Sequence, residues 1–233
     1  LGQRAAVTSA GIATVANAGT IGSATAADPY GVYLTGGGTF SNASGGIVQA
    51  GSIGVRLNGA SAAVDNAGSI VAGNDGIYLH STIWTLTNSG IVRSTTLDNG
   101  AYVNGGAGSI TNSGTFSGHY AGLWLINVGA AVIDNTGTLV GGYDGLYVGG
   151  GNAMLTNRGL IASTTLDNGV YVRNGTATIA NSGTISGAYD GLYFQGAAGT
   201  VTNSRKFSGA HATLQFAHCF ASRLIVDARA VFY

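Results

Sequence analysis

The fold follows from the stretch Ile179-Ala180-Asn181-Ser182-Gly183-Thr184-Ile185, whose pattern recurs along most of the chain. In most copies an apolar residue precedes an Asn by two positions, and a Gly and a second apolar residue follow it by two and four. The Asn recurs at intervals of 22 to 25 residues, and such a regular interval indicates a repeat architecture. The repeated Asn residues are Asn17, Asn42, Asn66, Asn88, Asn112, Asn135, Asn157, Asn181 and Asn203.

A second pattern, Gly-apolar-aromatic-apolar, occupies the other half of the period. Each period therefore holds three short alternating runs, which is the signal of strands. Three strands of about 4 residues and three corners use about 23 residues, the length of one coil of a parallel β-helix. The second pattern is found at 31–34, 76–79, 100–103, 122–125, 145–148, 169–172 and 191–194, and 54–57 keeps the frame with Arg56 in the aromatic position.

We therefore predict an all-β fold, a right-handed, single-stranded parallel β-helix with three strands per coil and about nine coils of 22–25 residues. The β-helix repeat domain is predicted over 1–216, and 217–233 is a degenerate segment that forms either a cap or a truncated continuation. Like positions of successive coils should stack, because side chains alternate along a strand. The Asn side chains should form a structural ladder, since each amide can bond to the coils above and below it. In the apolar core we expect Ile110, Ile133, Leu155 and Ile179 to lie above one another.

A longer repeat overlies the short one. The segments 94–100 and 163–169 have the same sequence, Ser-Thr-Thr-Leu-Asp-Asn-Gly, at an offset of 69 residues, or three coils. Duplication of a three-coil block explains this identity. Extra residues gather at the corner that contains these segments, at 24–30, 95–99 and 164–168, and loops at one corner are the natural place for variable contacts.

The composition excludes several classes of protein. The 233 residues include 41 Gly but one Lys, one Pro and no Glu, which does not suit a helical bundle, and 45% hydrophobic residues do not suit a disordered chain. Collagen needs Gly at every third position, and electrostatic nucleic-acid binding needs a basic patch, whereas nine bases here balance nine acids. No run of 18 apolar residues predicts a transmembrane helix, and the lone Cys219 allows no internal disulfide. The chain begins at Leu1 without a signal segment, so we expect a fragment or a processed piece.

The aromatic residues of the second pattern alternate with inward aliphatic residues, so we expect them to face outward along one flat side. Rings at strand spacing stabilise a sheet by stacking, and a stripe of exposed rings also binds sugars or a partner chain. This candidate binding surface, the aromatic stripe, consists of Tyr33, Tyr78, Tyr102, Trp124, Tyr147, Tyr171 and Tyr193.

A partial acid column precedes the Gly of the second pattern, at Asp75, Asn99, Ala121, Asp144, Asn168 and Asp190. Asp144 and Asp190 would lie two coils, about 10 Å, apart, which is loose for inverting and too wide for retaining glycoside hydrolysis. Stabilisation of a turn is the commoner role of such Asp residues, and a weak calcium site is the alternative. No metal-binding or phosphate-binding motif occurs, so we predict no catalytic residue, no metal and no cofactor. The histidines expected at the surface are His80, His119, His211 and His218.

The repeated Asn-Ser-Gly-Thr-Ile-Ser segments, as at 181–186, resemble passenger domains of bacterial autotransporters, the pertactin-like and self-associating adhesin group. Residues 12–216 carry this resemblance. The tail at 223–227 and 230–232 also resembles a segment common late in such passengers, where the family tends to carry Pro-Gly in place of Ala228-Arg229. The resemblance implies export from a Gram-negative bacterium, display at the cell surface or outer membrane or secretion, and a role in virulence. It also implies contact with the membrane only through a C-terminal barrel that this sequence does not include.

The repeat and the resemblance together predict a surface-exposed structural or adhesive stalk that mediates adhesion or self-association without catalysis. Its expected partners are glycans or proteins of host or bacterial surfaces, or further copies of the chain, and no nucleic acid. A polysaccharide-binding or polysaccharide-cleaving β-helix protein is the alternative, and the cleaving form would use Asp144, Asp190 and Arg173. An ice-binding solenoid would need a ladder of Thr-any-Thr and is not favoured, because most Thr residues here are single.

Overall fold

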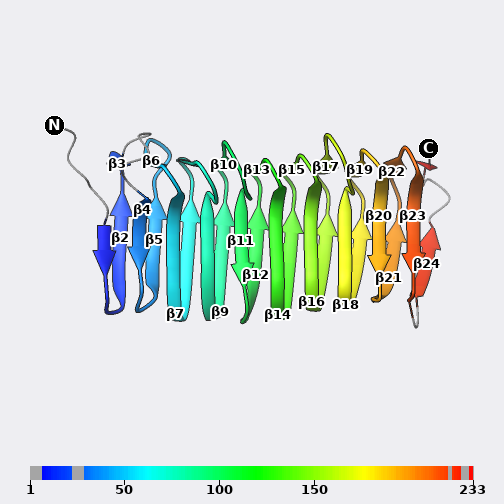
Figure 1. Cartoon of the computed structure of the whole chain (residues 1–233), viewed down its shortest axis with the longest axis horizontal. Coiled ribbons are helices and arrows are strands. Elements are labelled where there is room, and N and C mark those ends of the chain that lie inside the picture. Colours follow the sequence, from blue (N-terminus) through cyan, green and yellow to red (C-terminus); the bar gives the residue numbers. More distant parts are fainter. Residues whose placement is uncertain (1–6, 23–28, 220–221, 227–230, 233) are drawn as a thin grey trace.

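The computed structural model describes residues 7–22, 29–219, 222–226 and 231–232. This part of the chain contains strands and their connections but no helix. The strands wind into an elongated stack of about nine coils, and neighbouring coils pair in parallel (Figure 1). The predicted all-β parallel solenoid is therefore confirmed.

The described strands form two parallel sheets, a larger sheet of 15 strands and a smaller sheet of 10. The larger sheet contains β1 (Val7–Ser9), β2 (Ala13–Asn17), β4 (Tyr30–Leu34), β5 (Gly38–Asn42), β7 (Ile53–Asn66), β9 (Ile77–Asn88), β11 (Ala101–Asn104), β12 (Ala107–Asn112), β14 (Ala121–Asn135), β16 (Asp144–Asn157), β18 (Val170–Asn181), β20 (Asp190–Gln195), β21 (Ala198–Asn203), β23 (Ala212–Ala217) and β24 (Ser222–Val226). The smaller sheet contains β3 (Thr20–Gly22), β6 (Ile47–Ala50), β8 (Ser69–Ala72), β10 (Ile91–Ser94), β13 (Thr115–Gly118), β15 (Thr138–Gly141), β17 (Leu160–Ser163), β19 (Thr184–Gly187), β22 (Lys206–Gly209) and β25 (Val231–Phe232).

Two of the three sides of a coil often join without a break. Strands β7, β9, β14, β16 and β18 each run from the Gly-apolar-aromatic side, through a corner, to the repeated Asn. At this corner single residues with a left-handed conformation, such as Asn127 (φ 56°) and Asn174 (φ 53°), are left out of the pairing, which resumes after them, with a register shift between Val128 and Ala130. Three separate strands per coil are expected from the sequence, whereas the structure keeps three runs per coil and merges two of them into one bent strand in these coils.

The core consists of vertical columns of apolar side chains. Ile110 pairs with Ile133, Ile133 with Leu155 and Leu155 with Ile179, as predicted, and all four side chains are buried. Because like residues stack on like, each coil buries its apolar positions against both neighbouring coils, and a single coil would have no core of its own.

Trp84 is the largest fully buried side chain and stands in a column of small residues. Its neighbours in the adjacent coils are Ala62 and Gly108, and its indole N–H donates a hydrogen bond of 3.1 Å to the carbonyl oxygen of Gly105. A Cβ added at Gly108 would lie 2.6 Å from the indole ring. The small neighbours therefore create the space that the indole fills.

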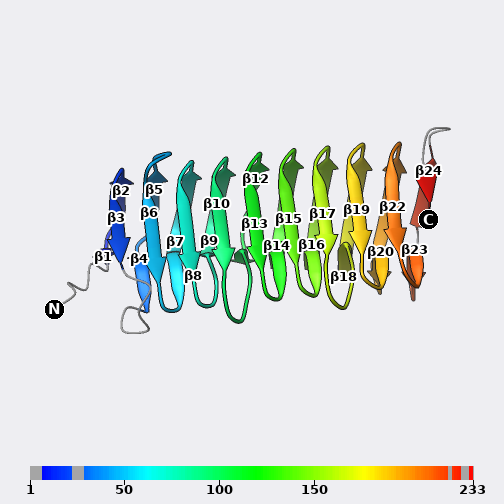
Figure 2. The same cartoon turned by 90° about the horizontal axis from the view of Figure 1, so that it is seen from above.

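The connections that follow the strands of the smaller sheet lie along one side of the stack (Figure 2). The duplicated loops 95–99 and 164–168 belong to this side, whereas the predicted insertion at 24–30 lies mostly outside the described residues. At the far end β24 pairs with β21, with Leu224 opposite Val201, and β25 pairs with β22. The described part of 217–233 therefore continues the coil pattern.

Candidate functional site

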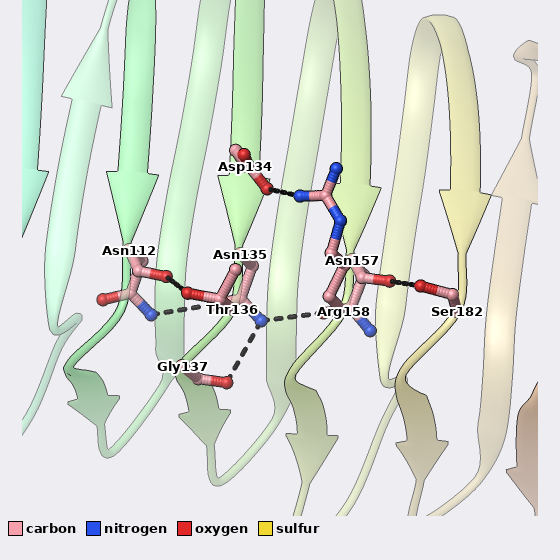
Figure 3. Close-up of polar contacts among 8 residues, drawn as sticks. All are labelled: Asn112, Asp134, Asn135, Thr136, Gly137, Asn157, Arg158 and Ser182. Atoms are coloured by element: carbon pink, nitrogen blue, oxygen red, sulfur yellow. Dashed lines mark hydrogen bonds and ion pairs between the residues drawn. The ribbon is translucent and has the colours of Figure 1, made fainter.

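The nine repeated Asn residues form a continuous ladder inside one corner of the coils. Each Asn from Asn17 to Asn181 donates from Nδ2 to Oδ1 of the Asn in the next coil, through eight hydrogen bonds of 2.7 to 2.9 Å. Asn135, in the middle of the ladder, is fully buried and connects Asn112 to Asn157 (Figure 3). Because these amides are buried and bonded to one another, the ladder stabilises the corner and is not a ligand site.

The aromatic stripe follows one side of the stack, because its residues share one register position in successive coils. The rings pack on one another and are half-buried rather than fully exposed, and Tyr147 is only 6% exposed. Partial burial raises the pKa of Tyr171 to about 12, so its phenol stays neutral at physiological pH. Stacking leaves mainly ring edges and hydroxyl groups at the surface. The stacked neighbours are Tyr78–Tyr102, Trp124–Tyr147 and Tyr171–Tyr193, with ring centres 5.0, 3.6 and 5.1 Å apart.

Arg56 continues the stripe although it is not aromatic. Its guanidinium carbon lies 5.1 Å from the ring centre of Tyr33 and 4.7 Å from that of Tyr78. A guanidinium group stacks on aromatic rings through its planar shape and its charge. Arg56 therefore bridges two coils of rings instead of interrupting them.

Two carboxyl groups of the acid column are buried beneath the duplicated loops. Asp75 and Asp144 are 8% and 3% exposed. Each Oδ1 accepts hydrogen bonds of 3.0 to 3.2 Å from the main-chain N–H and the side-chain amide of the Asn in the next coil, Asn99 and Asn168 respectively. Desolvation raises the pKa of Asp75 to about 6 and that of Asp144 to about 7, although the hydrogen bonds oppose the rise. Both carboxyl groups thus hold a loop against the preceding coil.

Asp190 has a different partner. It is 1% exposed, and its Oδ1 lies 2.9 Å from Nδ1 of His211, whose side chain is half exposed. From the sequence we expect His211 at the surface, without a carboxylate partner. The structure brings the two together because Asp190 pairs with Ala212 of the next coil, directly after His211. His80, His119 and His218 are exposed.

A second set of rings, which the sequence analysis does not identify, lies one residue before the acid column. Tyr120 and Tyr143 stack with ring centres 4.7 Å apart, and Tyr189 stacks on His211 at 4.3 Å. The available signal is an aromatic residue directly before the acid-column position, as in the dipeptides at 143–144 and 189–190. We call this set the corner column: Tyr120, Tyr143, Tyr189 and His211.

The residues that a polysaccharide-cleaving enzyme would use do not line one groove. Arg173 borders a shallow groove with Asn174 and Tyr147, whereas Asp190 borders another groove. Asp144 is bonded to the loop residue Asn168. Within the described ranges, no three His, Cys or Asp side chains are grouped closely enough to hold a metal ion.

These features define a parallel β-solenoid with a polar ladder inside one corner and rings along one side, a fold compatible with an autotransporter passenger domain. Comparison of the chain with models of protein families, with curated proteins and with solved structures gave no match. The residues that the structure describes include no helix of the length and hydrophobicity needed to cross a membrane.

Proposed function

We propose that this chain is the stiff stalk of an autotransporter passenger, displayed on or released from a Gram-negative cell, which mediates adhesion or self-association without catalysis. The observation that supports this proposal is that the stacked columns of side chains continue along the length of the rod. One ladder runs without a break from Asn17 to Asn203, and the core columns and the aromatic stripe follow it. A rod of this kind presents the same surface many times, so weak single contacts add up through multivalency.

The aromatic stripe is the side that we propose makes the contact. Tyr and Trp side chains combine a large apolar area with a hydrogen-bonding group and are enriched in the cores of protein interfaces. Ring edges and hydroxyl groups repeated in successive coils suit a glycan or protein surface, or a second copy of the chain.

The test uses cells that display the chain on an export barrel. One variant carries Tyr78→Lys and Tyr102→Lys, which place charge in the stripe. The matched control carries Thr85→Lys and Thr111→Lys, at exposed positions in the same two coils outside the stripe. At equal surface display, the stripe variant should lose most cell clumping and adherence, and the control should keep both. Equal clumping of the two variants would reject the stripe as the contact surface.

A further inference from the structure

A groove opens between the aromatic stripe and the corner column near the C-terminal end of the duplicated block. Its volume is about 310 Å³, at the small end of the range for ligand pockets, which leaves room for a single sugar ring. Tyr171 and Tyr193 of the stripe border the groove on one side, and Tyr189 and His211 of the corner column border it on the other. The remaining lining residues are Asp167, Asn168, Asp190 and Gln215.

The corresponding place in the first copy of the duplicated block is packed with rings. Tyr120 lies against Trp124 and Tyr143, with ring centres 4.9 and 4.7 Å away, and Trp124 stacks on Tyr147 at 3.6 Å. The two copies match coil by coil in their main-chain pairing. In the second copy the corresponding residues are Tyr189, Tyr193, His211 and Gln215. Two of the four rings have thus been replaced by an imidazole and an amide.

The two copies carry their buried acid-column carboxylate in different coils, Asp144 in the first copy and Asp190 in the second. Asp190 occupies the place of Ala121. It is almost completely buried, and its Oδ1 lies 2.9 Å from Nδ1 of His211. Burial of a carboxylate costs desolvation free energy, and the first copy builds the same coil with Ala121. Asp144 is bonded to the buried Asn168, whereas the partner of Asp190 is the half-exposed imidazole of His211, so the Asp190–His211 pair borders the groove and can contact a ligand there.

We propose that this groove binds one residue of a neutral glycan. Tyrosine hydroxyl groups, the amide of Gln215 and the Asp190–His211 pair supply both donors and acceptors, which suit a ligand with many hydroxyl groups. The apolar parts of the rings suit the C–H faces of a sugar. Asp167 and Asp190 add negative charge, which disfavours uronic and sialic acids. This inference rests on the proposed function, because it names the class of partner that the stalk would contact.

The first experiment compares ligands. The purified chain is titrated with neutral oligosaccharides of hexose and N-acetylhexosamine, with matched oligosaccharides that carry uronic or sialic acid, and with choline. Binding is followed by calorimetry and by NMR. We expect binding to neutral members of the panel and at least tenfold weaker binding to their acidic counterparts. A preference for acidic glycans, a preference for choline, or no binding to any neutral glycan would overturn the proposal.

The second experiment rebuilds the groove after the first copy, with Asp190→Ala, His211→Tyr and Gln215→Tyr. This variant should keep its melting temperature and lose at least tenfold in glycan affinity. Asp190→Asn preserves the shape of the site if the triple variant does not fold, and it should weaken binding about tenfold by removing a charged acceptor. Thr156→Ala, outside the groove, should bind normally. Unchanged affinity in the folded groove variants would overturn the proposal.

The two proposals fail separately. The proposed contact surface of the stalk is tested by the variant with Tyr78→Lys and Tyr102→Lys, and both residues lie outside the groove. If the stripe variant loses clumping while the unmodified chain binds no neutral glycan, only the groove inference is wrong. If neutral glycans bind through the groove while the stripe variant clumps normally, only the proposed contact surface of the stalk is wrong.

Discussion

Replacement of Asp144 by Asn should remove most of the pH dependence of stability that this residue causes. The acid column already holds Asn99 and Asn168, so an amide is compatible with this position. Oδ1 of Asp144 accepts two hydrogen bonds from Asn168, and an amide oxygen can accept the same two. The Asp144→Asn substitution therefore removes the ionisation and preserves these contacts.

The sign and size of the effect follow from the pKa of Asp144. Burial raises it from an ordinary 3.8 to about 7, so the folded state holds the proton more tightly than the unfolded chain. The stabilisation from the neutral carboxyl group is complete below about pH 4 and is lost as the pH rises through 7. At 1.36 kcal/mol per pKa unit, the difference of about 3 units costs at most about 4 kcal/mol above pH 8.

Urea denaturation followed by circular dichroism, at several pH values from 4 to 8, measures this effect. The free energy of unfolding of Asp144→Asn, relative to the unmodified chain, should rise by up to about 4 kcal/mol across this range. Asp75→Asn should show a smaller rise that ends about one pH unit lower, because the pKa of Asp75 is raised only to about 6. Asp167→Asn removes an exposed charge nearby and controls for net charge. A difference that stays constant with pH would refute the reasoning.

Three further substitutions test the ladder, the core and the surface through the free energy of unfolding. Asn135→Ala should destabilise the chain by about 2–4 kcal/mol, because it removes both ladder bonds of Asn135 and leaves the buried Oδ1 of Asn157 without its ladder donor. Gly108→Ala should cost about 1–3 kcal/mol, because the added methyl group would lie too close to Trp84. Arg158→Ala should change stability by less than about 1 kcal/mol, since its 2.7 Å ion pair with Asp134 is half exposed (Figure 3).

Matched controls separate these effects from general loss of structure. Asn17→Ala removes the first described residue of the ladder, which has one ladder bond instead of two, so its cost should be smaller than that of Asn135→Ala. Gly19→Ala adds a methyl group with no atom within 4 Å and should be close to neutral. If Asn17→Ala and Asn135→Ala cost the same, the ladder does not act as a chain of shared hydrogen bonds.

The coil length, the stacked core and the positions of the ladder residues could be predicted because each depends on the period alone. The stacking of Ile133 between Ile110 and Leu155 needs no knowledge of rotamers, since register and alternation determine it. Insertions at one corner are predictable for the same reason, because extra residues disturb the period at one place.

The side-chain contacts between columns could not be predicted in this way. A spacing rule treats Arg56 as a departure from the aromatic pattern and does not reveal that a guanidinium group stacks between rings of adjacent coils. The pairing of Asp190 with His211 depends on a register offset of one residue between neighbouring columns. The bent strands contain single left-handed residues such as Asn127, after which pairing between coils resumes at a corner where a loop is expected.

The direction of the Asn ladder bears on how such a rod changes its length. Each Asn between the two ends of the ladder donates toward the C-terminal side and accepts from the N-terminal side, so each of these coils has one ladder donor and one ladder acceptor at this corner. A block of whole coils can therefore be inserted or excised, and the two cut ends match again. The 69-residue duplication is such a block. The length of the solenoid can thus change in steps of about 4.8 Å per coil, with no change to its cross-section.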